Sequence, residues 1–258
     1  RHYQTYSFSF VDPWFGGRKP NSFSVSVYHQ NVRYISSNTE SEDSKQTFRL
    51  TGAAIGLGQR LQVPDYYFSL YLELSYKYYN LHDYQYSGMF YSTGSSNNLA
   101  LTAVLSRSSS GPNPIFPTTG SEFSASVELT PPYSCMNGKD YTNPEMTVQE
   151  RYKWVEYHKY KLSAKWFQTL FGAKDGGSRA LVLMAKAEFG LLCMYNKSVG
   201  KSPFEYFQLG GDGLYGYNLC GADYVGLRGY SNQSLTPTSN GYVYNKYSLE
   251  LRYPLSLN

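Results

Sequence analysis

Long apolar runs, cysteines and clustered charges are all scarce in this chain of 258 residues. No apolar run reaches the roughly 18 to 20 residues of a membrane helix, and no signal peptide opens the chain. The three cysteines (Cys135, Cys193 and Cys220) are too few for a disulfide framework, although Cys135 and Cys220 both fall in expected loops and are able to pair. The net charge is only +4, and no basic run is interleaved with aromatic residues, which argues against nucleic acid as a partner.

Motifs for catalysis or cofactor binding are equally scarce. The four histidines show no metal-ligand spacing, and no cysteine pair has the CxxC spacing. Gly211–Gly216 matches GxGxxG only formally, because no helix pattern follows that would bind a pyrophosphate. His82 beside Asp83 is the one adjacent pair that an outer-membrane hydrolase would use, and a solvated loop explains it better. The sequence therefore predicts no enzyme, cofactor or metal site.

Aromatic residues, by contrast, are abundant. The chain holds 28 Tyr and 14 Phe, and only 16% of its residues are charged. This composition argues against disorder and suits β-structure. Tyrosine also suits a membrane interface, because it has one apolar and one polar end. Composition alone leaves open a tyrosine-rich soluble β-protein, for example a glycan-binding sandwich.

Apolar and polar residues alternate with a period of two along most of the chain, which predicts β-strands. In the segment 66–80, Leu72 and Leu74 fall on one face, and Glu73 and Lys77 fall on the other. Its length of roughly fifteen residues exceeds the usual five or six of a strand. Nine segments show the pattern: 5–11, 21–34, 47–60, 66–80, 97–107, 120–130, 155–170, 179–195 and 242–254.

Charged residues in these segments keep to one face, as a polar lumen requires. A charge on the lipid face would cost about 2 to 4 kcal/mol at mid-bilayer. A solvated sheet face explains any single strand as well, but the repetition along the chain favours a lumen. The inward candidates by parity are Glu122, Glu128, Lys159, Lys161, Lys165, Lys186, Glu188, Lys246, Glu250 and Arg252.

The connections between the segments alternate in length. Compact ones (12–20, 61–65, 110–119 and 171–178) alternate with long ones (35–46, 81–96, 132–154 and 196–241). Short turns at one end and long loops at the other are typical of outer-membrane barrels. The sequence therefore predicts an all-β fold, a transmembrane antiparallel up-and-down β-barrel, with residues 1–258 as part of one domain of a longer polypeptide.

Five separated stretches occur in the same order as in one known family. They are Phe10–Ser22, Pro117–Ser121, Gly210–Gly213, Gly226–Tyr230 and Tyr247–Pro254. Nearly end to end, they resemble the barrel of the BamA family of outer-membrane protein assembly factors, most of all its Bacteroidetes members. The stretch Gly226-Leu227-Arg228-Gly229-Tyr230 matches the family's [VI]-R-G-[FY] signature in the sixth extracellular loop, with Leu227 as a conservative departure at the first position.

The resemblance implies a fragment of nine strands, similar to strands four to twelve of the family's sixteen-stranded barrel. The POTRA domains and the terminal strands would then lie outside the chain, and residues 196–241 would be an extracellular loop that folds into the lumen. By resemblance Arg228 pairs with an acid on the wall, and parity places Glu250 inward on the next strand. We therefore expect an Arg228–Glu250 ion pair that latches the loop, with Gly226 and Gly229 allowing the backbone to turn.

The function implied by the resemblance is non-enzymatic. Members of the family fold β-barrel proteins and insert them into the bacterial outer membrane. The expected partners are unfolded outer-membrane protein clients, accessory assembly proteins, and the lipid bilayer with its lipopolysaccharide, and no cofactor is expected. Two alternatives stay open, a translocating barrel of the two-partner-secretion type, which shares the R-G-[FY] loop, and a passive porin.

Overall fold

The computed structural model describes residues 2–17, 21–35, 45–84, 91–111, 116–172, 180–211, 222–232, 234–236 and 241–254. Among these residues, no helix has the length and apolar character needed to cross a membrane.

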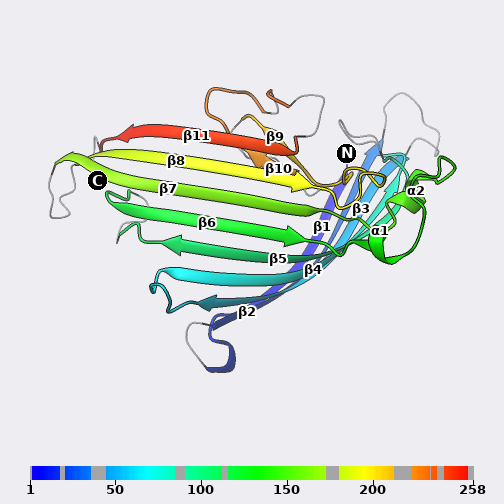
Figure 1. Ribbon diagram of the computed structural model, residues 1–258, viewed down its shortest axis with the longest axis horizontal. Helices are drawn as coiled ribbons and strands as arrows, with labels where there is room; N and C mark the ends of the chain where they lie inside the picture. The colour runs from blue at the N-terminus through cyan, green and yellow to red at the C-terminus, as the bar shows by residue number, and fades with distance from the viewer. Residues whose placement is uncertain are drawn as a thin grey trace.

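Nine long strands form one sheet in the order β1-β2-β3-β4-β5-β6-β7-β8-β11, and every neighbouring pair is antiparallel (Figure 1). This up-and-down order confirms the predicted antiparallel all-β arrangement. The sheet is open, since β1 and β11 are its edges and do not pair with each other. The strands are β1 (His2–Asp12), β2 (Asn21–Ile35), β3 (Lys45–Arg60), β4 (Phe68–His82), β5 (Gly94–Ser108), β6 (Gly120–Leu129), β7 (His158–Gly172), β8 (Ala180–Cys193) and β11 (Val243–Arg252).

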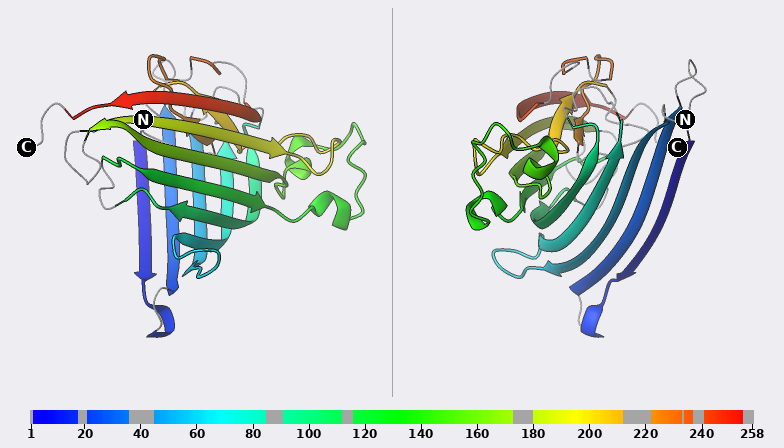
Figure 2. Two further views of the ribbon diagram at one scale, coloured as in Figure 1. Left: turned by 60° about the vertical axis from the view of Figure 1, so that its left-hand side comes forward. Right: turned by 90° about the vertical axis from the view of Figure 1, so that its right-hand side faces the viewer.

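The sheet curves strongly along its width. In Figure 2, β1 to β3 run at a steep angle to β6 to β8. Strands twist with a fixed hand, and a sheet this long accumulates that twist into the wall of a partial barrel. Closure into a complete barrel, and its strand number, stay predictions.

The two faces of the sheet carry the residues that parity assigned to them. On the outer face Leu74 and Leu249 are exposed apolar side chains. On the inner face Glu122 stands opposite Lys165, and Glu128 stands opposite Lys159. Because residues directly opposite each other share a face, the predicted inward placement of these charges on β6 and β7 is confirmed. On β2 and β3 the separation is incomplete, since Arg33 and Arg49 are exposed on the outer face with Val27 and Ile55.

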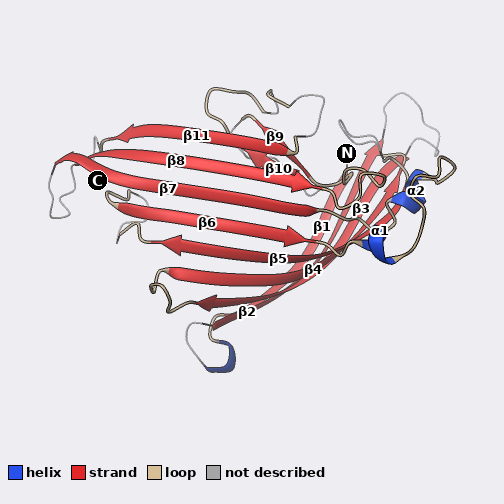
Figure 3. Ribbon diagram, viewed as in Figure 1, coloured by secondary structure: helices blue, strands red, loops and turns tan. Residues whose placement is uncertain are grey.

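The connections at one end of the sheet contain short elements that the period-two pattern did not predict (Figure 3). Helices α1 (Tyr133–Met136) and α2 (Val148–Arg151) lie between β6 and β7. Thr147 and Glu150 form a capping box at the start of α2. Strands β9 (Tyr206–Leu209) and β10 (Ala222–Val225) pair in parallel within the segment 196–241. At the opposite end of the sheet, a turn of 3-10 helix, η1 (Phe15–Gly17), lies between β1 and β2.

The largest group of buried apolar residues lies between the inner face and the segment that contains β9. Its members from the wall include Phe48, Tyr79 and Leu81, and those from the segment include Phe204 and Phe207. A single curved sheet has no second sheet to pack against. The segment 196–241 therefore supplies the second layer of the core.

Candidate functional site

Two phenylalanines, Phe204 just before β9 and Phe207 within it, are inserted among aromatic rings of the wall. Phe204 has no exposed surface and stacks on Tyr79, with ring centroids 4.0 Å apart and planes 3° apart. Phe207 is also buried and meets Tyr244 edge to face, at 4.9 Å between centroids. Offset-stacked and edge-to-face arrangements are the favoured geometries of aromatic pairs. The start of the loop is therefore packed as core.

Gly190 on β8 makes this packing possible. A Cβ at this position would collide with the ring of Tyr244 and would come 2.9 Å from Cζ of Phe207. Glycine, having no side chain, lets the two rings lie against the backbone of the wall.

A buried carboxylate lies between the two phenylalanines and binds lysines of the wall. Glu205 is 1% exposed, and its Oε2 accepts a hydrogen bond of 2.7 Å from Nζ of Lys159, which is 3% exposed. Nζ of Lys77 on β4 lies 3.9 Å from Oε1 of Glu205. Burial raises the pKa of Glu205 above its ordinary value, and the ammonium groups of Lys159 and Lys77 oppose that rise.

A second carboxylate, on β10, binds the same region of the wall. Oδ2 of Asp223 lies 2.6 Å from Nζ of Lys159, and Oδ1 lies 3.0 Å from Nζ of Lys161. Burial alone would raise the pKa of Asp223, but the two ammonium groups outweigh it and leave this pKa below its ordinary value. Lys159 therefore makes ion pairs with two separate parts of the loop.

Backbone hydrogen bonds hold the parts of the loop to one another. The amide of Phe207 donates to the carbonyl of Gly241 over 2.8 Å, and the amide of Gly241 donates back over 3.0 Å. Nearer the tip, the amide of Leu227 donates to the carbonyl of Gly211 over 2.8 Å. The arginine motif is thereby connected to the chain two residues after β9.

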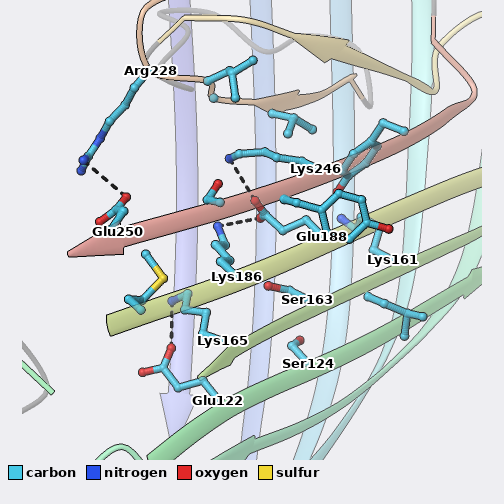
Figure 4. Close-up of a pocket in the computed structure, with 18 of the residues that line it drawn as sticks. Glu122, Ser124, Lys161, Ser163, Lys165, Lys186, Glu188, Arg228, Lys246 and Glu250 are labelled. Carbon is cyan, nitrogen blue, oxygen red and sulfur yellow. Dashed lines mark hydrogen bonds and ion pairs between the residues drawn. The ribbon is translucent and has the colours of Figure 1, made fainter. Parts of the chain in front are cut away.

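The structure brings the sequence-predicted pair Arg228 and Glu250 together at the loop tip (Figure 4). Nη1 of Arg228 lies 3.4 Å from Oε1 of Glu250, while the Arg228 side chain is 89% exposed. Arg252 contacts the other oxygen, Oε2, with Nη2 at 2.8 Å and Nε at 3.0 Å. That the Arg228 pair latches the loop stays a prediction.

The rest of the predicted motif surrounds this contact. Gly229 has φ 85°, in the left-handed region that favours glycine, whereas no positive φ is recorded for Gly226. Gly226 and Leu227 line a cavity under the loop tip, and Tyr230 is exposed. In the predicted Gly210–Gly213 stretch, positions 212 and 213 lie outside the described residues.

The cavity under the loop tip has a volume of about 1160 Å³ and a charged wall (Figure 4). Glu188 lies between Lys186 at 2.8 Å and Lys246 at 2.9 Å. Glu122 pairs with Lys165 at 2.8 Å. Acids that alternate with cations along and across neighbouring strands form a polar surface.

The remaining chemistry-bearing residues lie elsewhere. In the described part of the chain, no group of three or more His, Cys, Asp or Glu is arranged to hold a metal ion. His82 and Asp83 lie on the exposed surface, 3.8 Å apart, and neither lines the cavity. Cys135 is exposed with a free thiol, and Cys220, with which the sequence left a pairing open, lies outside the described residues.

Sequence reasoning placed Lys159 and Lys161 inward but missed their partners in the loop. The overlooked signal was two acids embedded in apolar or aromatic sequence. Glu205 stands between Phe204 and Tyr206, and Asp223 precedes Tyr224 and Val225 in a short alternating run. An acid in such surroundings is buried when the segment packs, and a buried charge needs a partner.

Comparisons with known proteins agree with this architecture. The structure of BamA from Haemophilus ducreyi lacking POTRA domains 1–3 is similar, with a TM-score of 0.61 and 18% sequence identity. The similarity covers 96% of this chain and 44% of that one, so the chain spans less than half of the solved protein. No curated protein matches the sequence. The Omp85 superfamily domain matches residues 1–258, and the chain belongs to the Omp85 superfamily.

Proposed function

We propose that this chain forms part of an outer-membrane barrel that folds β-barrel proteins and inserts them into the membrane. One observation carries the proposal. The antiparallel wall has an apolar outer face and a charged inner face, and the loop that bears Gly226–Tyr230 is packed on the inner face. Superfamily membership and the fold shared with BamA support this reading.

The open edges of the sheet suggest how the wall continues. Unpaired strand edges cannot face lipid, because their backbone groups would lack hydrogen bonds. We infer that further strands pair with β1 and β11 in the whole protein, consistent with strands four to twelve of a sixteen-stranded barrel. In this arrangement the strands outside this chain form the seam at which client strands pair edge to edge, beside a locally thinned bilayer.

The proposed assignment to the Bacteroidetes members of the BamA family rests on the sequence. The stretches Asp12–Gly17 and Tyr253–Asn258 resemble the Bacteroidetes members of the BamA family. By that resemblance, POTRA domains precede the barrel, the long loops are extracellular, and accessory assembly proteins and lipopolysaccharide are its partners. The chain's contribution to the machine is a rigid wall and a loop that occupies the lumen, with no covalent chemistry.

Two other functions compete with assembly. A two-partner-secretion transporter shares the R-G-[FY] loop and exports a single client, and Gly226–Tyr230 fits that class too. A passive porin needs an unobstructed lumen, which the packing of Phe204 and Phe207 on the inner wall disfavours.

Depletion of the full-length protein in its host, followed by quantification of the outer-membrane proteome, separates the three functions. Assembly predicts loss of many unrelated β-barrel proteins. Loss of one secreted client with a normal outer-membrane proteome would establish secretion. Reduced uptake of small solutes alone would establish a porin. Either of these last two results contradicts the assembly proposal.

A further inference from the structure

We propose that the loop is held on the wall chiefly by a buried anchor, in which Glu205 and Asp223 bind Lys159 and Phe204 stacks on Tyr79. The exposed Arg228–Glu250 contact is a secondary attachment. The anchor follows from contacts within this chain and does not depend on which client the barrel serves.

Burial distinguishes the two attachments. Glu205 and Lys159 are both almost fully buried and lie 2.7 Å apart, whereas Arg228 is largely in solvent and lies 3.4 Å from Glu250. Exposed ion pairs contribute little to stability, because water screens them and long side chains lose entropy when held. Removing one partner of a buried pair is strongly destabilising, because the other charge stays buried without compensation.

Arg228 also competes with Arg252 for the carboxylate of Glu250, which weakens the exposed attachment further. The carboxylate of Glu250 is already bound by Arg252 on the same strand, through two hydrogen bonds of 2.8 Å and 3.0 Å. Arg228 therefore approaches an acid whose charge is largely satisfied. The two loop carboxylates, in contrast, both bind Lys159, and Asp223 also binds Lys161.

Aromatic packing reinforces the ion pairs at the same place. Phe204 is the residue immediately before Glu205, and its ring lies 4.0 Å from that of Tyr79. Nζ of Lys159 also lies 5.6 Å from the centre of the Phe207 ring. Apolar packing around the ion pairs excludes water, which strengthens their attraction.

The anchor has a consequence for the charge of the lumen. When the loop is docked, Glu205 and Asp223 neutralise lysines on β7. When it undocks, these two carboxylates leave, and Lys159 and Lys161 face the open lumen. The barrel then presents more positive charge along its pore, which raises the local concentration of anions.

Hydrogen exchange in the full-length protein tests which attachment dominates. The reporters are the amides of residues 206–209 and 222–225, which pair with each other in the docked loop. We expect Glu205→Gln and Asp223→Asn to speed their exchange about tenfold or more. Arg228→Ala is expected to speed it less than about threefold. Glu122→Gln is the matched control, because the ion pair of Glu122 with Lys165 joins two strands of the wall and not the loop to the wall.

Conductance in planar bilayers gives a readout that general destabilisation would not produce. Glu205→Gln and Asp223→Asn should shift the ion selectivity of the barrel toward anions, whereas Arg228→Ala should leave the selectivity less changed. Asp223 is 29% exposed, so its substitution remains informative if Glu205→Gln fails to fold.

Two results would overturn the anchor. One is faster loop exchange in Arg228→Ala than in either carboxylate variant. The other is unchanged exchange and unchanged selectivity in both carboxylate variants. Neither result bears on the depletion phenotype, so failure of the anchor and failure of the proposed function are distinguishable.

Discussion

At the scale of single residues, the loop is fixed by side chains that meet the wall in the interior. Phe204, Glu205 and Phe207 are consecutive or nearly so, and all three are buried against the wall, with Tyr79 of β4, Lys159 of β7 and Tyr244 of β11 among their partners. Lys159 contacts both Glu205 and Phe207, so substitutions at these positions test parts of one packed cluster.

The first residue-scale prediction concerns Phe204→Ala. Replacing a fully buried phenylalanine removes its apolar contacts and leaves a cavity, at a cost of about 3 to 5 kcal/mol. We expect loop docking, measured by hydrogen exchange at residues 206–209, to weaken by an amount of this order. Leu235→Ala is the control, because Leu235 lies in the same loop and is exposed. Equal effects in the two variants would contradict the packing described here.

The second residue-scale prediction concerns Gly190→Ala. The added methyl group has no room beside Tyr244 and Phe207. Overpacking of this kind costs about 1 to 3 kcal/mol. We expect a lower unfolding midpoint in urea and a weaker contact between the loop and β8. A midpoint equal to that of the wild type would show that the rings move aside freely.

The third residue-scale prediction concerns pH and Asp223. Its pKa is lowered in the folded state, so the stability that it contributes is complete above the ordinary aspartate pKa of about 3.9. That stability is lost as pH falls through the lower folded value. Lys159 and Lys161 of β7 and Tyr244 of β11 are the titratable groups that face Asp223.

The measurement is the difference in urea unfolding midpoint between the wild type and Asp223→Asn, followed from pH 7 to pH 2. We expect the wild type to be more stable near neutrality and the difference to disappear at the acidic end. If the difference in midpoint grew as the pH fell, the pKa of Asp223 would be raised and not lowered in the folded state.

At the scale of elements, the tip of the loop depends on a hydrogen bond that the amide of Leu227 donates to the carbonyl of Gly211, two residues after β9. Leu227→Pro removes the amide that donates to Gly211. We expect the tip to loosen and trypsin to cleave faster after Arg228, while β9 and β10 stay protected. Leu227→Ala keeps the amide and is the matched control. Equal cleavage rates in the two variants would show that this bond does not position the tip.

The elements differ in how well the sequence predicted them. The long strands were predictable because one face meets an apolar environment and the other a polar one, so Leu72, Glu73 and Leu74 alternate over many residues. Strands β9 and β10 were not, since four residues show too little of a period-two pattern. Helix α2 has a capping box at Thr147, but its single turn carries no apolar repeat.

The candidate site was predictable to the same extent as the strands that carry it. Parity placed Glu250 and Lys159 on the inner face, because each lies on a long alternating strand. The alternation of inward and outward residues gave no information on Glu205 and Asp223. Their partners are set by where the loop packs on the inner face of the wall. Contacts between a loop and a distant strand depend on the tertiary fold, which local patterns do not encode.

At the scale of the whole molecule, the open sheet predicts that residues 1–258 do not form a stable barrel alone. The edges β1 and β11 carry unpaired backbone groups. We expect the isolated chain to associate in detergent, and the full-length protein to run as a defined species in size-exclusion chromatography. A monodisperse, folded monomer of residues 1–258 would contradict the inference that neighbouring strands complete the wall.

We propose that the full-length protein accelerates the insertion of other β-barrel proteins into the membrane. The most direct test reconstitutes it in liposomes and measures the folding rates of several unrelated β-barrel clients, by protease protection. The account predicts faster folding for every client than in empty liposomes. Rates equal to those in empty liposomes, or acceleration of a single client only, would contradict it.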